Sequence, residues 1–258
     1  MILRYGEHPS QYGELTLPDG PGPWPVAVVV HGGFWRPTYG LELGRPLAAD
    51  LVEHGVAAWN VEYRRVGDDP VAGGGGWPTT CLDVAAAVDL LAGEGQRAAH
   101  QRLDLRRVVP IGHSAGGHLA GWLAARATLP SGAPGGAPVV KVSGFVSQAG
   151  VLDLADGARQ HLGAGAVDAL LGTRAGPEDV ALASPVERVP LGVASVCLHG
   201  TADDVVPLRQ SERFVAAATK AGDDARLVRL DGADHSDVVD PRLPAWAACR
   251  EALLGLLR

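Results

Sequence analysis

One short segment of the chain has the residue types of a serine nucleophile. Residues 112–116 read GHSAG, in which Ser114 has a glycine two positions to either side. The apolar run VVPI precedes this segment and the helical pattern LAGWLAARA follows it. A strand, a sharp turn and a helix in this order lift a serine hydroxyl above the end of a sheet. Because so short a pattern can arise by chance in a chain with 35 glycines, the partners of Ser114 have to decide its role.

A serine of this kind needs a base that takes its proton and an acid that orients the base. In a strand-turn-helix arrangement, the acid and then the base follow the serine, each just after a later strand. The segment VCLHGTADDVVP provides Asp203, and LDGADHSDVVDP provides His235, the only histidine after Asp203. Asp204 is the alternative acid, but the spacing favours Asp203, and Asp204 could instead cap the following helix. The predicted catalytic residues are therefore Ser114, Asp203 and His235.

A second segment with glycines is expected to stabilise an oxyanion. The run VVVHGGFW, residues 28–35, ends an apolar strand on two glycines, and glycine allows a close approach or backbone angles that other residues resist. We predict that the oxyanion hole forms at Gly32, Gly33 and Phe34, and that the N–H group of Ala115, the residue after the nucleophile, completes it.

The elements that would position these residues alternate along the chain. Short β-branched runs predict strands at 26–30, 56–63, 107–112, 142–150, 193–200 and 225–230, and helical periodicity predicts helices near 43–54, 79–92, 115–128, 208–221 and 244–257. This order predicts an α/β fold, a mostly parallel twisted sheet with helices on both faces, with antiparallel edge strands from the N-terminal segments ILRYG and ELTLP. Residues 151–190 are long for a plain connection, so we expect a small cap over the site within a single domain of residues 1–258.

Together these motifs resemble the α/β-hydrolase family from about Val26 to the C-terminus. The segments HGGFW, EYRR and WPTTCLDVAAAVD resemble the kynurenine formamidase (arylformamidase) branch and its bacterial esterase relatives, in which HGGxW marks the oxyanion loop. The resemblance implies a serine hydrolase that cleaves a small carboxylic ester or aryl amide through an acyl-enzyme, with an N-formylkynurenine-like substrate as one candidate and with no metal or organic cofactor. Trp35 and Trp77 could be ordinary core residues, but both flank loops expected at the mouth of the site, so they are candidates for its walls. His113 is the third candidate for a substrate contact.

Other functions remain open on the same motifs. A general short-chain carboxylesterase or an acyltransferase would use the same three catalytic residues. A ligand receptor on a hydrolase fold is a further alternative, although such receptors commonly lose a catalytic residue and this chain has a candidate for each.

Charge and composition limit the partners. The net charge is −7, and Lys and Arg are scattered along the chain, which disfavours nucleic acid as a partner. The N-terminal residues lack an export pattern and no segment has 18 consecutive apolar residues, so we expect a cytoplasmic protein without a membrane anchor that acts on a small molecule. Cys81, Cys197 and Cys249 are widely spaced and are expected to be reduced and buried.

Overall fold

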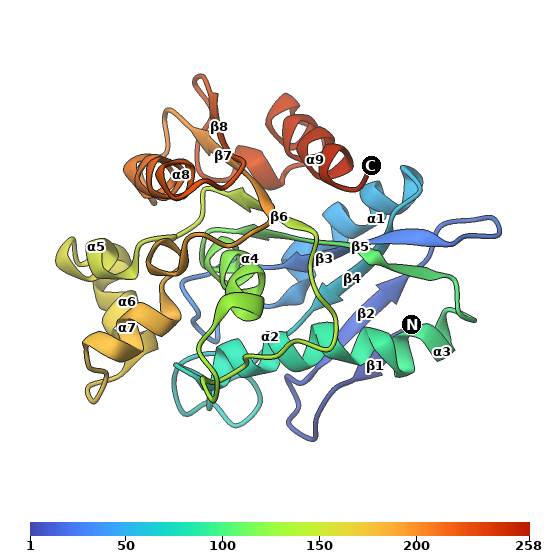
Figure 1. Ribbon diagram of the computed structural model, residues 1–258, viewed down its shortest axis with the longest axis horizontal. Coiled ribbons are helices and arrows are strands. Elements are labelled where there is room, and N and C mark those ends of the chain that lie inside the picture. The colour runs from blue at the N-terminus through green and yellow to red at the C-terminus, as the bar shows by residue number, and fades with distance from the viewer.

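A single mixed sheet forms the centre of the computed structural model, which describes residues 1–258 (Figure 1). Its strands are β1 (Ile2–Arg4), β2 (Tyr12–Thr16), β3 (Trp24–Val30), β4 (Ala57–Val61), β5 (Leu103–His113), β6 (Gly144–Gln148), β7 (Ala194–Gly200) and β8 (Ala225–Leu230). They lie in the order β1-β2-β4-β3-β5-β6-β7-β8. The pairs β1·β2 and β2·β4 are antiparallel and all the others are parallel. The predicted fold class is confirmed.

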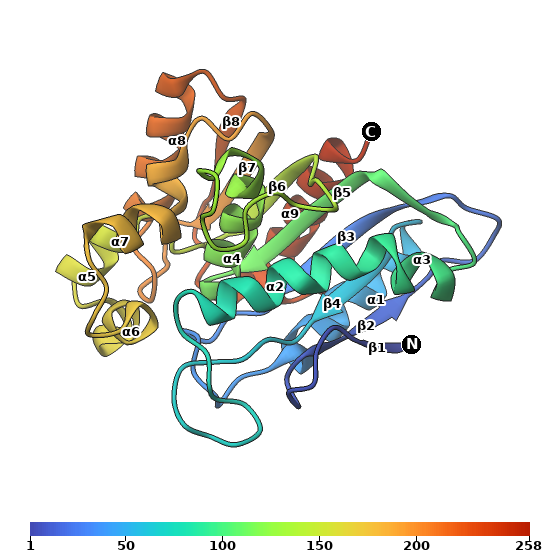
Figure 2. The same ribbon diagram turned by 60° about the horizontal axis from the view of Figure 1, so that its bottom comes forward.

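Helices cover both faces of this sheet (Figure 2). They are α1 (Arg45–Glu53), α2 (Thr79–Asp89), α3 (Glu94–Ala98), α4 (Ala115–Ala125), α5 (Leu154–Arg159), α6 (Leu162–Leu171), α7 (Pro177–Ala183), α8 (Arg209–Ala221) and α9 (Pro244–Leu256), with short 3-10 turns such as η1 (Leu41–Gly44) and η5 (Asp237–Val239). Helices α1 and α9 pack on one face, and α2, α4 and α8 pack on the other. No helix has the length and apolar character that crossing a membrane requires.

The central strands contribute to the core on both faces. Val26 and Val28 of β3 pack with α2 and α4, whereas Ala27 and Val29 pack with α1 and α9. Successive side chains of a strand point to opposite faces, so a strand covered on both sides is apolar at every position. The loops that follow β3, β5, β7 and β8 carry the predicted site residues, and they meet at one edge because these strands are parallel.

Residues 151–190 form α5, α6 and α7, which lie together at one end of the molecule (Figures 1 and 2). Their buried residues Leu154, Leu162 and Val167 belong to the same hydrophobic cluster as β3 and α4. This segment therefore shares the core of the sheet instead of enclosing a core of its own.

Candidate active site

Ser114 occupies the turn between β5 and α4, and its backbone is strained. Its φ of 54° and ψ of −117° lie outside the regions that residues other than glycine favour. The turn is held by the N–H group of Ser114, which donates to the carbonyl oxygen of Gln148 at 2.9 Å. Larger residues cannot replace the glycines two positions before and after Ser114, because a Cβ at Gly112 would lie 2.0 Å from the carbonyl oxygen of Gly116, and a Cβ at Gly116 would lie 2.1 Å from that of Val30.

Asp203 and His235 come together from the loops after β7 and β8. Nδ1 of His235 donates to Oδ2 of Asp203 at 2.7 Å. The backbone N–H groups of Val205 and Val206 donate to Oδ1 of Asp203, each at 2.9 Å. Asp204 is exposed and takes no part in this network.

The hydrogen bonds around Asp203 determine its charge. Burial raises the pKa of this carboxyl, but hydrogen bonds from His199 and His235 outweigh burial and hold the pKa well below its ordinary value. Asp203 is therefore ionised at neutral pH, and its bond to Nδ1–H leaves Nε2 of neutral His235 as the accepting nitrogen.

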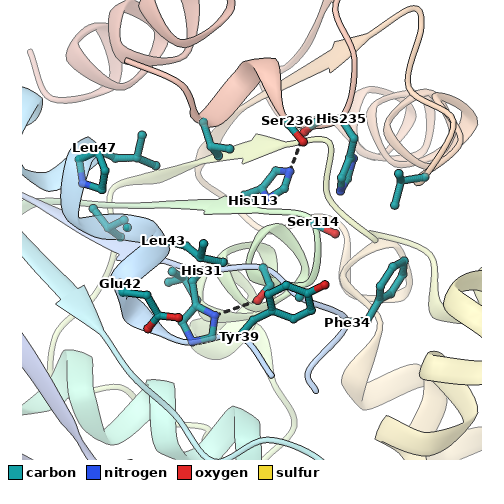
Figure 3. Close-up of a pocket in the computed structure, with 18 residues that line it drawn as sticks. His31, Phe34, Tyr39, Glu42, Leu43, Leu47, His113, Ser114, His235 and Ser236 are labelled. Atoms are coloured by element: carbon teal, nitrogen blue, oxygen red, sulfur yellow. Dashed lines mark hydrogen bonds between the residues drawn. The ribbon is translucent and has the colours of Figure 1, made fainter. Parts of the chain in front are cut away.

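Ser114 and His235 line the same pocket (Figure 3). No hydrogen bond joins Ser114 Oγ to the His235 ring in this structure, and such contacts often form only when a substrate is bound. The arrangement brings a hydroxyl, an accepting imidazole nitrogen and an ionised acid to one cavity, which is what general-base activation of a serine requires.

The loop after β3 offers free backbone donors to this cavity. Gly33, Phe34 and Trp35 all lie in the left-handed region, with φ values of 107°, 51° and 55°. The N–H groups of Gly33 and Phe34 donate no hydrogen bond within the chain. The N–H group of Ala115 begins α4, where no carbonyl one turn earlier is placed to accept it. Free amides and the positive end of a helix dipole suit a developing oxyanion.

Gly32 lets this loop lie directly against the nucleophile turn. A Cβ at Gly32 would lie 2.9 Å from the carbonyl oxygen of His113 and 3.1 Å from Cβ of Ser114. A larger residue would push the loop, and with it the N–H groups of Gly33 and Phe34, away from the serine.

A buried polar cluster of His31, Glu62, Tyr63 and Arg65 packs against the oxyanion loop. His31 hydrogen-bonds Oε1 of Glu62 at 2.9 Å, and its ring stacks on Tyr63 with centroids 4.3 Å apart. Oε2 of Glu62 accepts the N–H group of Leu41 at 3.0 Å, and Arg65 pairs with the same carboxylate. One carboxylate thus ties the oxyanion loop to η1, the next wall of the cavity.

The cavity has a volume of about 570 Å³. Its walls are the oxyanion loop, the segment from η1 to the start of α1, and the loops that carry the acid and the base (Figure 3). No Lys or Arg lines it, and Glu42 is its one carboxylate. The apolar and aromatic side chains that line it include Tyr39, Leu43, Leu47, Val205 and Val239.

Two of the predicted substrate contacts lie elsewhere. Trp35 is fully buried in the core and packs edge-on against His118, with centroids 5.3 Å apart. Trp77 packs edge-on against Trp122 at 6.2 Å and donates to Asp179 at 3.0 Å. Neither lines the cavity, although Trp77 is only half-buried.

The third predicted contact, His113, does line the cavity. It also holds the loop of the base, since its Nε2–H donates to the carbonyl oxygen of His235 at 2.8 Å. Burial lowers the pKa of His113 to about 3, so its ring is neutral at physiological pH.

The predicted cap does not reach the cavity. None of residues 151–190 lines it, and α6 instead contacts the oxyanion loop, where Arg36 donates to the carbonyl oxygen of Gly163. Sequence reasoning missed the real walls, Tyr39, Leu43, Leu47, Val205 and Val239. The available signal was their position just after the oxyanion segment, the acid and the base.

Comparison with known proteins identifies the family and the fold of this chain. The profile of the BD-FAE family matches residues 15–217. A probable isoprenylcysteine α-carbonyl methylesterase from Oryza sativa subsp. japonica is 28% identical to this chain over 91% of the chain and 56% of its own length. The chain thus spans little more than half the length of this curated relative.

Solved esterase structures share the fold. A truncated carbohydrate esterase from gut microbiota matches with a TM-score of 0.77 at 21% identity, over 98% of this chain and 94% of that one. A thermophilic esterase from the planctomycete Thermogutta terrifontis, with butyrate bound, matches with a TM-score of 0.75 at 23% identity, over 95% and 88%. The sheet, the helices and the nucleophile turn match this fold. Since the family profile also covers most of the sequence, the chain belongs to the BD-FAE family of α/β-hydrolases.

Proposed function

We propose that this chain is a serine carboxylesterase that hydrolyses esters of short carboxylic acids, with Ser114 as nucleophile, His235 as base and Asp203 as the orienting acid. The observation that carries the proposal is the 2.7 Å hydrogen bond from His235 to Asp203 beside a cavity that also contains Ser114 and the oxyanion loop.

The residues would act in two half-reactions. Ser114 Oγ attacks the ester carbonyl carbon while Nε2 of His235 takes the hydroxyl proton, and the N–H groups at Gly33, Phe34 and Ala115 stabilise the oxyanion. The tetrahedral intermediate collapses, the bond to the alcohol oxygen breaks, and His235 gives its proton to the departing alcohol. Water then attacks the acyl-enzyme with His235 again as base, which releases the acid and restores Ser114.

Related proteins support an ester rather than an aryl amide as the substrate. The rice relative is named as a methylesterase, and the Thermogutta esterase was solved with butyrate bound. The two tryptophans that were expected to favour an aryl formamide, Trp35 and Trp77, do not line the cavity. We also infer that residues 1–258 form one domain, since residues of 151–190 share the core of the sheet.

A kinetic panel tests this function. We expect kcat/KM to be highest for p-nitrophenyl acetate, propionate and butyrate, to fall towards the octanoate, and to be far lower for N-formylkynurenine. Added amine or alcohol acceptors should leave the free acid as the main product, whereas an acyltransferase would divert the acyl group to them. The Ser114→Ala variant sets the background rate. Faster cleavage of N-formylkynurenine than of every short ester would overturn the proposal, as would the absence of turnover with any ester.

A further inference from the structure

His199, near the end of β7, is fully buried and lies against the acid. Its Nε2 is 3.2 Å from Oδ2 of Asp203 and 2.8 Å from the carbonyl oxygen of Val206. Its Nδ1 is 2.8 Å from the hydroxyl of Ser211 on α8. Oδ2 of Asp203 therefore has two imidazole neighbours, His235 and His199.

The groups around the His199 ring determine which nitrogen carries the proton. The carbonyl of Val206 and the ionised Asp203 can only accept, so Nε2 must be the donor. The Ser211 hydroxyl can donate, so Nδ1 can accept. This neutral tautomer satisfies both ring nitrogens, and the buried ring needs no charge.

We propose that His199 is a positioning residue for Asp203, whose Nε2–H shares Oδ2 with His235 and thereby sets how strongly Asp203 holds the base. This inference rests on the proposed function of the triad. Two backbone donors hold Oδ1 and His235 donates to Oδ2, with Nε2 of His199 3.2 Å from the same oxygen, so the carboxylate cannot rotate without breaking a hydrogen bond.

Because Oδ2 of Asp203 also faces His199, it is a weaker hydrogen-bond acceptor for His235. After burial, which raises the pKa of Asp203, the hydrogen bond from His199 is the largest influence, and it lowers that pKa. An acceptor that is already engaged stabilises an imidazolium less, so the shared oxygen favours return of His235 to its neutral, active form.

The titratable and charged groups around the pair include one further imidazole. His113, whose ring lies 4.4 Å from that of His235, has a pKa lowered by burial to about 3. Charged groups on the surrounding elements include Asp204, Asp231, Asp234 and Asp237 on the two loops. On α8 and β8 they include the ion pairs Arg209–Asp156, Arg213–Asp153, Arg226–Asp224 and Arg229–Glu212.

The test is the pH dependence of kcat/KM for p-nitrophenyl acetate. His199→Phe fills the space without a donor. The acid limb of the kcat/KM profile should therefore shift to higher pH by about half a pH unit or more. On the plateau, kcat should fall about three- to tenfold with little change in KM. His199→Gln returns an N–H group near the Nε2 position and should restore the wild-type limb.

Ser211→Ala is the matched control, because it disturbs the same ring from the other side. The two acceptors at Nε2 remain, so the limb should stay at the wild-type pH. An unshifted limb in His199→Phe would overturn the proposal. An equal shift in Ser211→Ala would also overturn it, since the shift would then report loosened packing.

A measurement on the wild-type chain covers variants that fail to fold. In protein labelled with ¹⁵N-histidine, His199 should be the neutral Nε2–H tautomer throughout the active pH range. The Nδ1–H tautomer, or a titration of His199 within that range, would overturn the proposal. If the wild-type chain cleaves no ester, the proposed function fails, and the tautomer still reports separately whether His199 donates to Asp203.

Discussion

Replacing Asp203 by Asn should disable the base, because the surrounding donors dictate how the amide must sit. Val205 and Val206 donate to Oδ1, so the amide oxygen has to take that position. The amide nitrogen then occupies the position of Oδ2, 2.7 Å from Nδ1 of His235. Nδ1 of His235 must now accept a hydrogen bond, so the imidazole proton moves to Nε2. Protonated Nε2 can no longer take the proton of Ser114.

The size of the effect follows from two losses. A carboxylate and an imidazolium about 4 Å apart attract by about 4 kcal/mol at an effective dielectric constant of about 20, which corresponds to about 10³ in rate. The wrong tautomer adds to this loss, and the same substitution in a serine protease triad costs about 10⁴ in kcat. We expect Asp203→Asn to lower kcat by about 10³ to 10⁴ with KM within about threefold of wild type.

Stopped-flow hydrolysis of p-nitrophenyl acetate measures this loss, with thermal unfolding to show that the variant is folded. Asp204→Asn is the matched control, since Asp204 is exposed and outside the network, and it should stay within about twofold of wild type. If Asp203→Asn retains more than a tenth of the wild-type kcat, or if Asp204→Asn is the inactive variant, the assignment of the acid is wrong.

Four further predictions concern single positions. A fluorophosphonate should label Ser114 alone, and persistent labelling of Ser114→Ala would contradict this nucleophile. Glu42→Gln should raise kcat/KM for p-nitrophenyl hemisuccinate about two- to fivefold relative to the neutral acetate, because a like charge at the cavity is removed, and the gain should shrink in high salt; an equal gain for both esters would contradict a charge effect. Gly116→Ala should lower the free energy of unfolding in urea by about 2 kcal/mol or more, since the new Cβ would lie 2.1 Å from the carbonyl oxygen of Val30; an unchanged urea midpoint would refute the close packing of this turn. Burial lowers the pKa of His118 to about 4, below its ordinary value in the unfolded chain, so its contribution to stability is complete above about pH 6.5 and is lost as the pH falls towards 4; His118→Gln should flatten that fall in urea midpoints measured from pH 4 to 7, and an equally steep fall would show that His118 does not cause it.

Local sequence was sufficient to predict the fold and the order of the candidate triad along the chain. The run VAVVV predicts a strand because β3 is buried on both faces, and such a strand must be apolar at each position. The glycines on either side of Ser114 predict the tight turn for a similar reason, since the contacts that exclude a Cβ arise within the turn and its neighbouring strand.

Only the tertiary structure determines which residues line the cavity and where the tryptophan rings lie. Tyr39 and Val205 are far apart in sequence and line one cavity, because parallel strands bring their following loops to the same edge of the sheet. Trp35 follows the oxyanion glycines directly, yet its ring lies in the core against His118. The direction of that ring depends on three consecutive left-handed residues and on the side chains packed beneath the loop, and neither is a property of the neighbouring letters in the sequence.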